Sequence, residues 1–174
     1  MQLNRIVILG NAGSGKSSLA RKLGQKLSSP IVHLDRLFWG PNWTKPVADE
    51  FRNKVIEAIS DSRWICEGNY SRRTFDLRLP KADLIIWLNT PRLTCLKRVL
   101  IRTFRNEQRP DLPDDCSEKI DLEFLSFLRY IWHFDQKYRP LIEAERQAMG
   151  PNVPVIYLNS EVQVFDFIKK ITES

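Results

Sequence analysis

Residues 10–17 read Gly-Asn-Ala-Gly-Ser-Gly-Lys-Ser, the complete Gly-x-x-x-x-Gly-Lys-Ser pattern of a loop that binds phosphate groups. Its glycines permit backbone conformations in which successive N–H groups point inward and surround phosphate oxygens. The Lys16 ammonium would reach the terminal phosphates of a nucleotide, and the Ser17 hydroxyl would help to hold Mg²⁺. A strand-length apolar run precedes the motif and a helical pattern follows it, which is the context that this chemistry needs. The predicted nucleotide-binding residues are Gly10, Asn11, Ala12, Gly13, Ser14, Gly15, Lys16, Ser17 and Ser18.

Two acidic residues at the ends of apolar runs are candidates for the chemistry beside this loop. Glu67 closes the run Trp64–Cys66, where a carboxylate could contact the metal and face the substrate. Asp35 follows the run Ile31–Leu34 and could accept a proton from a substrate hydroxyl or anchor an acceptor by hydrogen bonds. Gly68 would let a ligand approach the backbone. The structural alternatives are a surface carboxylate for Glu67 and a loop-capping aspartate for Asp35.

The segment after Asp35 is unusually aromatic for a turn. Phe38, Trp39 and Trp43 surround a Gly-Pro pair at positions 40 and 41. These rings could stack on a planar acceptor or close over it, and Trp39 is assigned to the acceptor site. Packing of the segment onto the domain explains the same residues equally well. His133 lies in a long apolar pattern and is expected to pack there without a catalytic role.

The basic residues are concentrated in one part of the chain. Between positions 72 and 109, eight Arg and two Lys oppose three acidic residues, a balance of +7 in a protein whose net charge is +6. Arginine binds phosphate oxygens bidentately, so a cluster of this kind favours a site for phosphates. Arg72, Arg73 and Arg78 could meet an acceptor phosphate. A second row could neutralise the transferring phosphoryl group, with a solvated basic face as its alternative, and comprises Arg98, Arg102, Arg105 and Arg109.

Apolar runs of strand length alternate with helical patterns, which predicts a parallel sheet covered by helices. Ligands of such sheets bind beyond the carboxyl ends of the strands, where the motifs above all fall. The predicted strands are Arg5–Leu9, Ile31–Leu34, Trp64–Glu67, Leu84–Leu88 and Val153–Leu158.

Three helices carry recognisable signals. Thr90 and Pro91 predict a helix start, with an apolar stripe at Leu93, Leu96, Leu100 and Phe104. Ser160 and Gln163 have the spacing of a capping box. A long helix is expected from about Ser117 to Met149, with Leu122, Leu125, Leu128, Ile131 and Trp132 on one side. The polar segment Arg105–Asp115, with two prolines, predicts a mobile excursion before that helix.

The composition bounds the class of protein. The chain has 174 residues, 43% hydrophobic and 28% charged, as expected of one globular domain over residues 1–174. Its three cysteines form neither a disulfide framework nor a zinc pattern, which favours a reducing cytoplasmic location. The longest unbroken apolar run, Leu84–Leu88, is too short to span a membrane, and no signal peptide is recognised.

With these residues in place, the chain resembles the adenylate kinase-like P-loop proteins of the DNA topology modulation (FlaR-type) family. The resemblance implies a nucleoside-monophosphate-kinase-like α/β fold of three layers, a five-stranded parallel sheet in the order 2-3-1-4-5, and helices on both faces. It also implies ATP with Mg²⁺ and an arginine-rich lid at about residues 102–115. The matching stretches cover nearly the whole chain and comprise residues 10–17, His33–Trp39 with Trp43, Glu67–Arg72, Leu77–Pro80 and Asp121–Leu125.

The chain departs from the wider group at two points. The acid that closes the third strand is usually aspartate, and here it is the longer Glu67. Adenylate kinases carry Gly-x-Pro-Arg after that acid, whereas this chain reads Gly68-Asn69-Tyr70-Ser71-Arg72. The second difference counts against AMP as the acceptor.

Two functional hypotheses follow. The first is a kinase that moves the γ-phosphoryl group of ATP to a nucleotide or another small molecule between Asp35 and Arg72, with Lys16, Arg98 and Arg102 as further catalytic residues. A hydroxyl acceptor is a variant of it, because the Asp35 segment resembles the base-bearing segment of nucleoside and sugar kinases. The substrate-binding set is Asp35, Trp39, Glu67, Gly68, Arg72 and Arg78, and the metal-binding set is Ser17 and Glu67.

The second hypothesis is an ATP-dependent regulatory or DNA-associated protein. The basic segment could follow a DNA backbone, but no helix-turn-helix or zinc motif accompanies it. The sequence leaves a monomer and a homodimer equally open. The absence of an Asn-Lys-x-Asp motif counts against a GTPase.

Overall fold

The computed structural model describes residues 3–105, 110–113, 116 and 120–172. Five parallel strands form one sheet in the order β2-β3-β1-β4-β5, which confirms the expected topology. The predicted strands all form, and three of them differ from the prediction by one or two residues at an end. Their bounds are β1 Arg5–Gly10, β2 Ile31–His33, β3 Trp64–Glu67, β4 Leu84–Leu88 and β5 Val155–Leu158.

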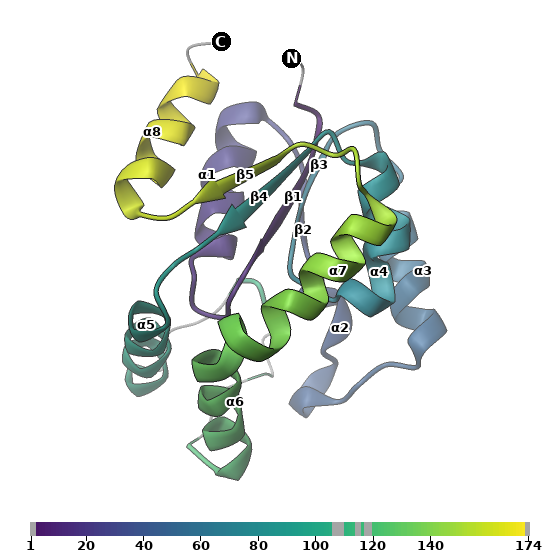
Figure 1. The fold of residues 1–174 in the computed structure, drawn as a ribbon. Helices are drawn as coiled ribbons and strands as arrows, with labels where there is room; N and C mark the ends of the chain where they lie inside the picture. Colours follow the sequence, from purple (N-terminus) through teal and green to yellow (C-terminus); the bar gives the residue numbers. More distant parts are fainter. Residues whose placement is uncertain (1–2, 106–109, 114–115, 117–119, 173–174) are drawn as a thin grey trace.

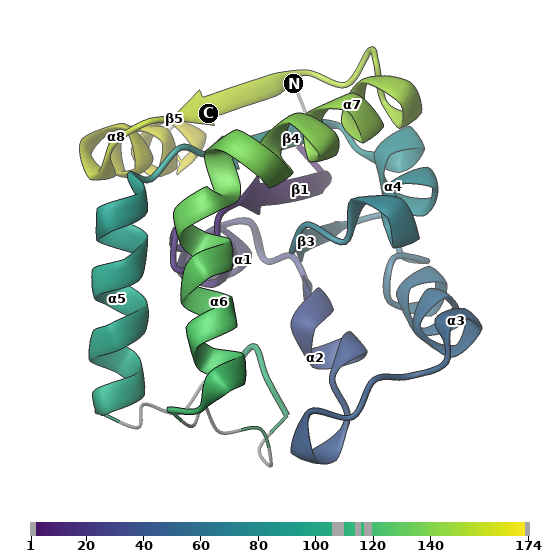
Figure 2. The ribbon, with the colours of Figure 1, turned by 60° about the horizontal axis from the view of Figure 1, so that its bottom comes forward.

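Helices cover both faces of the sheet and extend past its carboxyl end (Figure 1). One face packs on α1 and α8, the other on α3, α4 and α7. The helices α5 and α6 lie beyond the carboxyl ends of the strands, and α5 and α6 run side by side (Figure 2). The helix bounds are α1 Lys16–Leu27, α2 Leu34–Phe38, α3 Ala48–Ala58, α4 Ser71–Arg78, α5 Arg92–Phe104, α6 Leu122–His133, α7 Arg139–Met149 and α8 Glu161–Thr172.

The central strand shows why these runs are continuously apolar. Ile6 and Ile8 of β1 pack toward α1 and α8, while Val7 and Leu9 pack toward the opposite layer. All four side chains are fully buried. A parallel strand covered by helices on both faces has no solvated side, so it needs no polar alternation.

The long helix expected from about Ser117 to Met149 is wrong as a single element. The chain breaks into α6, a π-helical turn at Phe134–Tyr138, and α7. Pro140 stands in the first turn of α7, where its missing N–H and its ring disrupt the hydrogen bonding of a continuous helix. Residues 117–119, at the expected start, lie outside the described part of the chain.

The expected apolar stripe of this region is also only partly buried. Leu122 and Leu125 are exposed, whereas Phe124 and Ile131 face the interior. Part of the apolar stripe predicted for this helix is therefore exposed to solvent.

The start and the buried face of α5 differ from the prediction too. Pro91, not Thr90, occupies the position that precedes the helix, and the Thr90 hydroxyl donates to the backbone oxygen of Ser14 at 2.9 Å. Cys95 and Val99 form the buried face, while Leu93 and Phe104 at the ends of the predicted stripe are exposed. Cys95 and Val99 face the protein interior because α5 approaches the phosphate-binding loop closely on that side of the helix.

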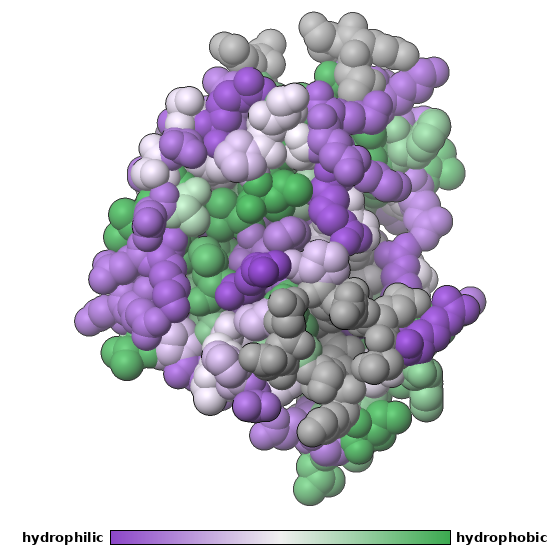
Figure 3. Space-filling model, turned by 180° about the vertical axis from the view of Figure 1, so that it is seen from behind, coloured by the Kyte–Doolittle hydropathy of each residue, from purple (hydrophilic) through white to green (hydrophobic). Residues whose placement is uncertain are grey.

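The surface and the thiols add two further facts. Figure 3 shows hydrophilic side chains over much of the side opposite to Figure 1, with separate hydrophobic patches between them. Among the described helices, none is long and apolar enough to cross a membrane.

Cys66, Cys95 and Cys116 are buried free thiols. At the last helix, the Ser160 hydroxyl accepts from the N–H of Gln163 at 3.2 Å, as the capping spacing predicted.

Asp83 joins the start of β1 to β4. Its carboxylate accepts from the backbone N–H of Arg5 at 2.9 Å and of Asn4 at 3.2 Å, and from the Arg5 guanidinium at 2.9 Å. Burial opposes ionisation, but these hydrogen bonds and the Arg5 charge outweigh it, so the pKa of Asp83 lies below its ordinary value. A lowered pKa in the folded chain adds stability above the pKa of the unfolded chain, and this stability is lost as the pH falls through the folded value.

The variant Asp83→Ala is expected to lower the free energy of unfolding at pH 7 by about 1–3 kcal/mol, because charge-assisted hydrogen bonds and backbone partners are lost. Urea unfolding at pH 7 and at pH 3 measures this, and the difference from the parent should shrink at pH 3. Asp61→Ala, at an exposed carboxylate, is the matched control. Equal losses at both pH values would show that the charge of Asp83 does not stabilise the fold.

Candidate functional site

The loop between β1 and α1 has the backbone form that phosphate binding requires. Gly13 has a φ of +75°, and a Cβ at this position would lie 2.6 Å from the backbone oxygen of Cys95. Glycine therefore allows both the left-handed turn and the close approach of α5. The Lys16 ammonium donates to the backbone oxygens of Gly10 at 3.2 Å and Asn11 at 2.9 Å. In this position Lys16 lies at the mouth of the loop.

The predicted loop residues divide into those that line the cleft and those that support it. The Asn11 amide donates to the backbone oxygen of Ile131 at 2.9 Å, and its oxygen accepts from the N–H of Ala12 at 2.8 Å. Asn11 thus fastens the loop to α6. The loop residues that line the cleft are Ala12, Gly13, Gly15, Lys16, Ser17 and Ser18.

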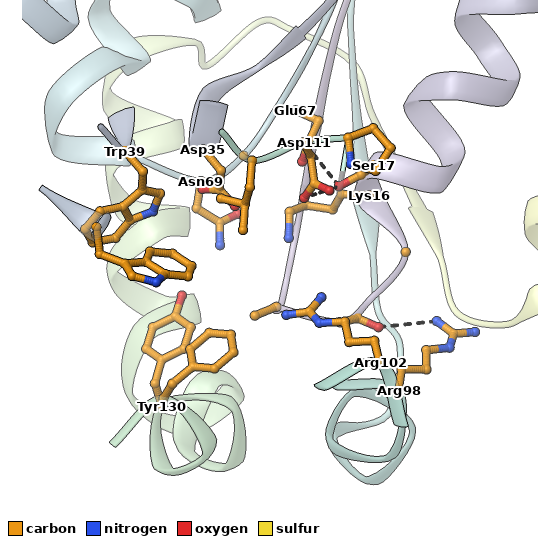
Figure 4. Close-up of a pocket in the computed structure, with 18 of the residues that line it drawn as sticks. Lys16, Ser17, Asp35, Trp39, Glu67, Asn69, Arg98, Arg102, Asp111 and Tyr130 are labelled. Carbon is orange, nitrogen blue, oxygen red and sulfur yellow. Dashed lines mark hydrogen bonds between the residues drawn. The ribbon is translucent and has the colours of Figure 1, made fainter. Parts of the chain in front are cut away.

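A cavity of about 1060 Å³ lies beyond the carboxyl ends of the strands, next to this loop. Its walls come from the loop, α1, α2, the segment after α2, the turn after β3, α5, residues 110–112 and α6. Figure 4 shows Trp39 and Tyr130 on one side of this cleft, Arg98 and Arg102 on another, and Lys16 and Ser17 at the loop. The cleft is large enough for a nucleotide and a second small molecule.

Three oxygen-bearing side chains meet beside the loop. The Ser17 hydroxyl lies 3.0 Å from a carboxylate oxygen of Glu67 and 3.2 Å from one of Asp111. Hard oxygen donors of this type suit Mg²⁺. Within the described residues, no group of three or more His, Cys, Asp or Glu side chains is placed to hold a metal ion.

Glu67 is deeply buried and has a second partner. Its carboxylate lies 2.8 Å from Nδ1 of His33, and the residue is 2% exposed. The register of β2 and β3 brings these two residues together, since His33 pairs with Glu67 across the strands. The alternative of a surface carboxylate at position 67 is therefore wrong. His33 and Asp111 were not among the predicted site residues.

The predicted lid lies partly within the described residues. Arg102 belongs to α5, and the segment 110–113 reaches the cleft with Asp111 and with Leu112, which is 1% exposed. Arg36 donates to the backbone oxygen of Pro110 at 3.1 Å and so joins this segment to α2. Residues 106–109 and 114–115 of the predicted lid lie outside the described part of the chain.

Asp35 lines the cleft, but it belongs to the short helix α2 and not to a loop. The Tyr70 hydroxyl donates to its Oδ1 at 2.8 Å. Burial, with the charge and hydrogen bonding of Asp35 added, raises the pKa of Tyr70 above its ordinary value, so the phenol remains a donor. The Tyr70 ring packs on Phe38 and Phe51, at centroid distances of 4.9 and 5.1 Å.

The aromatic segment after α2 divides between core and cleft. Phe38 is buried and packs on Phe51 and Tyr70, whereas Trp39 and Trp43 line the cleft. Packing onto the domain is therefore correct for Phe38, while stacking of Trp39 and Trp43 on an acceptor stays a prediction. From α6, Phe127 and Tyr130 join the same cavity, which sequence patterning did not indicate.

Arg98 and Arg102 of α5 line the cleft at its phosphate end. Arg98 donates to the backbone oxygens of Ser14 at 3.2 Å and Gly13 at 3.4 Å, and it forms an ion pair with Glu161. Arg98 thus supports the loop from α5. Arg21 of α1 also lines the cleft, although sequence analysis did not select it. Arg109 lies outside the described residues.

None of the three predicted acceptor arginines lines the cleft, and Arg73 lies over the Phe38 ring, 5.3 Å from its centroid. Arg72 is 73% exposed in its side chain, on the outer side of α4, and lies 3.8 Å from Glu145. Arg78 is fully buried and donates to the backbone oxygens of Gly68 at 3.1 Å and Asn69 at 2.6 Å. The assignment of Arg72 and Arg78 to substrate binding is therefore wrong.

The turn after β3 explains this difference. Gly68 and Tyr70 both have positive φ, at 124° and 35°, so the chain reverses sharply before α4. The reversal places Arg78 beneath the turn, where its guanidinium satisfies two backbone oxygens of that turn. Asn69 is presented on the other side, and its side chain donates to the backbone oxygen of Gly10 at 2.9 Å and accepts from its N–H at 3.2 Å. Asn69 thereby holds the start of the phosphate loop, a role no sequence signal indicated.

Comparisons with known proteins agree with this geometry. No family model matches the chain. The shikimate kinase of Buchnera aphidicola subsp. Baizongia pistaciae is 32% identical over 139 residues, covering 71% of this chain and 78% of that relative. The chain belongs to the family of P-loop kinases that includes shikimate kinase. The shikimate kinase of Blochmanniella floridana is 32% identical over 120 residues, covering 61% of this chain and 63% of that relative.

Solved structures of P-loop kinases share the fold. Shikimate kinase from Acinetobacter baumannii, solved with shikimate, has a TM-score of 0.56 at 18% identity and covers 99% of this chain and 92% of that one. Deoxyadenosine kinase from M. mycoides, solved with dATP, has a TM-score of 0.60 at 14% identity over 97% of both chains. Similarity at this level concerns the fold alone.

Membership in this family decides the reaction class. The protein is an ATP-dependent phosphotransferase with the P-loop kinase fold, and it uses ATP with Mg²⁺. The comparisons do not show the narrower resemblance to DNA topology modulation proteins. They also give no support to the regulatory alternative.

Proposed function

We propose that this kinase transfers the γ-phosphoryl group of ATP to a hydroxyl group of a small acceptor bound beside Asp35. The observation that carries the proposal is the carboxylate of Asp35, which Tyr70 holds at 2.8 Å in the cleft that also contains Lys16 and Ser17. A positioned carboxylate near a phosphate-binding loop can take the proton of an attacking hydroxyl.

The phosphate end of the cleft supplies binding and charge. The backbone N–H groups of the loop and the Lys16 ammonium would bind the phosphates of ATP. Ser17 would hold Mg²⁺ with Glu67 and Asp111, directly or through water, because all three supply hard oxygen donors on one side of the loop. Held there, the ion would supply positive charge to offset the negative charge of the ATP phosphates.

The transfer itself is an in-line displacement. The acceptor oxygen forms a bond to the γ-phosphorus, and the bond from that phosphorus to the β–γ bridging oxygen breaks, so ADP leaves with the bond's electron pair. Asp35 accepts the hydroxyl proton. Arg102 stabilises the charge on the equatorial oxygens, while Arg98 keeps the loop in place through Ser14 and Gly13. We further propose that the chain acts in this reaction as a single domain and that Arg102 and residues 110–112, which line the cleft, belong to its lid.

The test is ADP release from ATP and Mg²⁺ in the presence of single candidate acceptors: nucleosides, nucleoside monophosphates, and hydroxyl compounds such as shikimate. Lys16→Ala serves as the blank. We expect release that depends on a hydroxyl acceptor and disappears in the blank, with phosphate found on that hydroxyl by mass spectrometry. Release stimulated only by nucleoside monophosphates, with phosphate added to their phosphate group, would refute the proposal.

The variant Tyr70→Phe tests how Asp35 is held. Because the ionised carboxylate loses a charge-assisted hydrogen bond, the acid limb of the kcat profile should move to higher pH. kcat above that limb should change by less than about tenfold, since the carboxylate remains. Tyr157→Phe, at a half-exposed phenol on β5, is the control. An acid limb at the same pH in Tyr70→Phe would mean that Tyr70 only packs beside Phe38 and does not affect the ionisation of Asp35.

A further inference from the structure

Four aromatic side chains line the part of the cleft that adjoins Asp35. Trp39 and Trp43 come from the segment after α2, and their rings lie 5.2 Å apart at 78°. Phe127 and Tyr130 come from α6, with ring planes only 8° apart and centroids 6.5 Å apart. Figure 4 shows Trp39 and Tyr130 on the same side of the cleft, away from Ser17. We call Trp39, Trp43, Phe127 and Tyr130 the aromatic pocket.

The backbone holds Trp43 in an unfavourable conformation. Asn42 and Trp43 have φ values of 52° and 61°, in the left-handed region that a bulky side chain rarely adopts. A turn imposes this form: Gly40 donates its N–H to the oxygen of Thr44 at 2.9 Å, and Thr44 donates its N–H to that of Pro41 at 3.2 Å. Strain of this type is typical of ligand-binding segments.

Gly40 and Thr44 approach each other closely in this turn. A Cβ on Gly40 would lie 2.5 Å from the Thr44 hydroxyl oxygen, so a larger residue would displace the Thr44 side chain. The Thr44 hydroxyl also donates to the oxygen of Pro41 at 2.9 Å. The Trp43 indole therefore reaches the cleft because the whole turn directs it there.

A second set of contacts holds the α6 side of the pocket. The Tyr130 ring packs on Tyr138 and Phe134, at centroid distances of 4.5 and 5.8 Å. Burial raises the pKa of Tyr130 to about 12, so its hydroxyl stays neutral. Aromatic rings thus face the acceptor position from two elements that are far apart in the sequence.

The chemistry of this pocket selects a flat ring. An aromatic ring stacks on indole and phenyl faces, whereas a puckered alicyclic ring gains only contact area. The three arginines predicted to meet an acceptor phosphate have other contacts: Arg72 lies near Glu145, Arg73 lies over the Phe38 ring, and Arg78 donates to the turn after β3. Asp35 lines the same cavity, so a ligand in the pocket can also present a hydroxyl to the carboxylate.

We propose that the acceptor is a nucleoside, whose base stacks in the aromatic pocket while a sugar hydroxyl meets Asp35. The orientation of that hydroxyl rests on the proposed function. Binding of the base does not, because stacking needs no phosphoryl transfer.

The experiment measures binding without turnover. The protein, with its ATP site saturated by Mg²⁺ and the nonhydrolysable analogue AMP-PNP, is titrated calorimetrically with uridine, thymidine, cytidine, adenosine or guanosine, and with shikimate as the non-planar probe. We expect at least one nucleoside to bind with 1:1 stoichiometry and at least about tenfold more tightly than shikimate, because stacking contributes to nucleoside binding alone.

Variants then assign the binding to the pocket. Trp43→Leu and Trp39→Leu should each weaken nucleoside binding by about tenfold or more, and Trp43→Phe by less than about threefold, since it keeps an aromatic face. Trp132→Leu, at a tryptophan on α6 that stacks under Arg92 outside the cleft, should leave binding unchanged. Unchanged affinity for AMP-PNP shows that each variant is folded.

The outcomes separate this inference from the proposed function. Nucleoside binding that Trp43→Leu does not weaken, or shikimate binding without nucleoside binding, overturns the aromatic-pocket assignment even if a hydroxyl is phosphorylated. Nucleoside binding that is lost in Trp43→Leu supports the inference even if ADP release fails, and the failure then concerns phosphoryl transfer alone.

Discussion

Replacing Arg102 with alanine is expected to lower kcat by about 10³-fold or more, which is the loss seen when an arginine that stabilises the transferring phosphoryl group is removed. Arg102 lines the phosphate end of the cleft, and α5, which carries it, packs directly on the phosphate-binding loop. The charge it neutralises is largest in the transition state, so the affinity for AMP-PNP should fall much less than kcat.

Single-turnover rates with saturating ATP and acceptor measure this effect, and calorimetry measures AMP-PNP binding. Lys97→Ala is the matched control, because Lys97 lies on the exposed side of the same helix and does not line the cleft. Equal losses in kcat and in AMP-PNP affinity would show that Arg102 binds the ground state. Equal kcat values for the two variants would remove Arg102 from the catalytic machinery.

The variant Asp35→Asn is expected to lower kcat by about 10²- to 10⁴-fold, since the hydroxyl loses its proton acceptor. The geometry of the site should persist, because the asparagine oxygen can still accept the hydrogen bond that Tyr70 donates at 2.8 Å. Affinities for ATP and for the acceptor should therefore change little.

Steady-state kinetics from about pH 3.5 to 9, a range that extends below the ordinary pKa of an aspartate, test this expectation together with calorimetric affinities for AMP-PNP and the acceptor. In the parent enzyme, kcat should fall at low pH as the carboxylate becomes protonated, and that acid limb should disappear in Asp35→Asn. Asp61→Asn, at an exposed carboxylate, controls for the loss of one negative charge. A variant that keeps both the rate and the acid limb would rule out Asp35 as the proton acceptor.

The position of Asp111 shows one limit of sequence reasoning. The segment around it reads as a polar excursion, and its proline content distinguishes it only as irregular. Its carboxylate lies 3.2 Å from the Ser17 hydroxyl, 94 positions earlier in the chain. A contact between residues so far apart in the sequence depends on the path of the chain between them. No local sequence pattern predicts that path.

The arginines show a second limit. Arg78 and Arg102 come from one basic segment, yet one is buried under a backbone turn and the other lines the cleft. A helical period places residues relative to one another, but the rotation of the helix against its neighbours decides which side faces the site. For α5, contact with the loop at Gly13 selects Cys95 and Val99 as the buried side.

The sequence by itself determined the features that are local or periodic. The loop at residues 10–17 could be recognised because phosphate is bound by backbone N–H groups within one continuous segment. The five strands could be located because strands covered on both faces are continuously apolar, and Asp35 and Glu67 could be placed at their ends. The order of the strands came from the family resemblance, since sequence pattern does not fix strand neighbours.

The tertiary structure alone decided which side chains share the cleft. The register of β2 with β3 brought His33 to Glu67, and the left-handed turn after β3 moved Arg78 out of the site while directing Asn69 and Tyr70 toward it. The aromatic pocket likewise joins the segment after α2 to α6, nearly ninety positions later. Packing between distant elements sets the directions of side chains in a folded chain. The packing energy is distributed over the whole core, so no single motif predicts these directions.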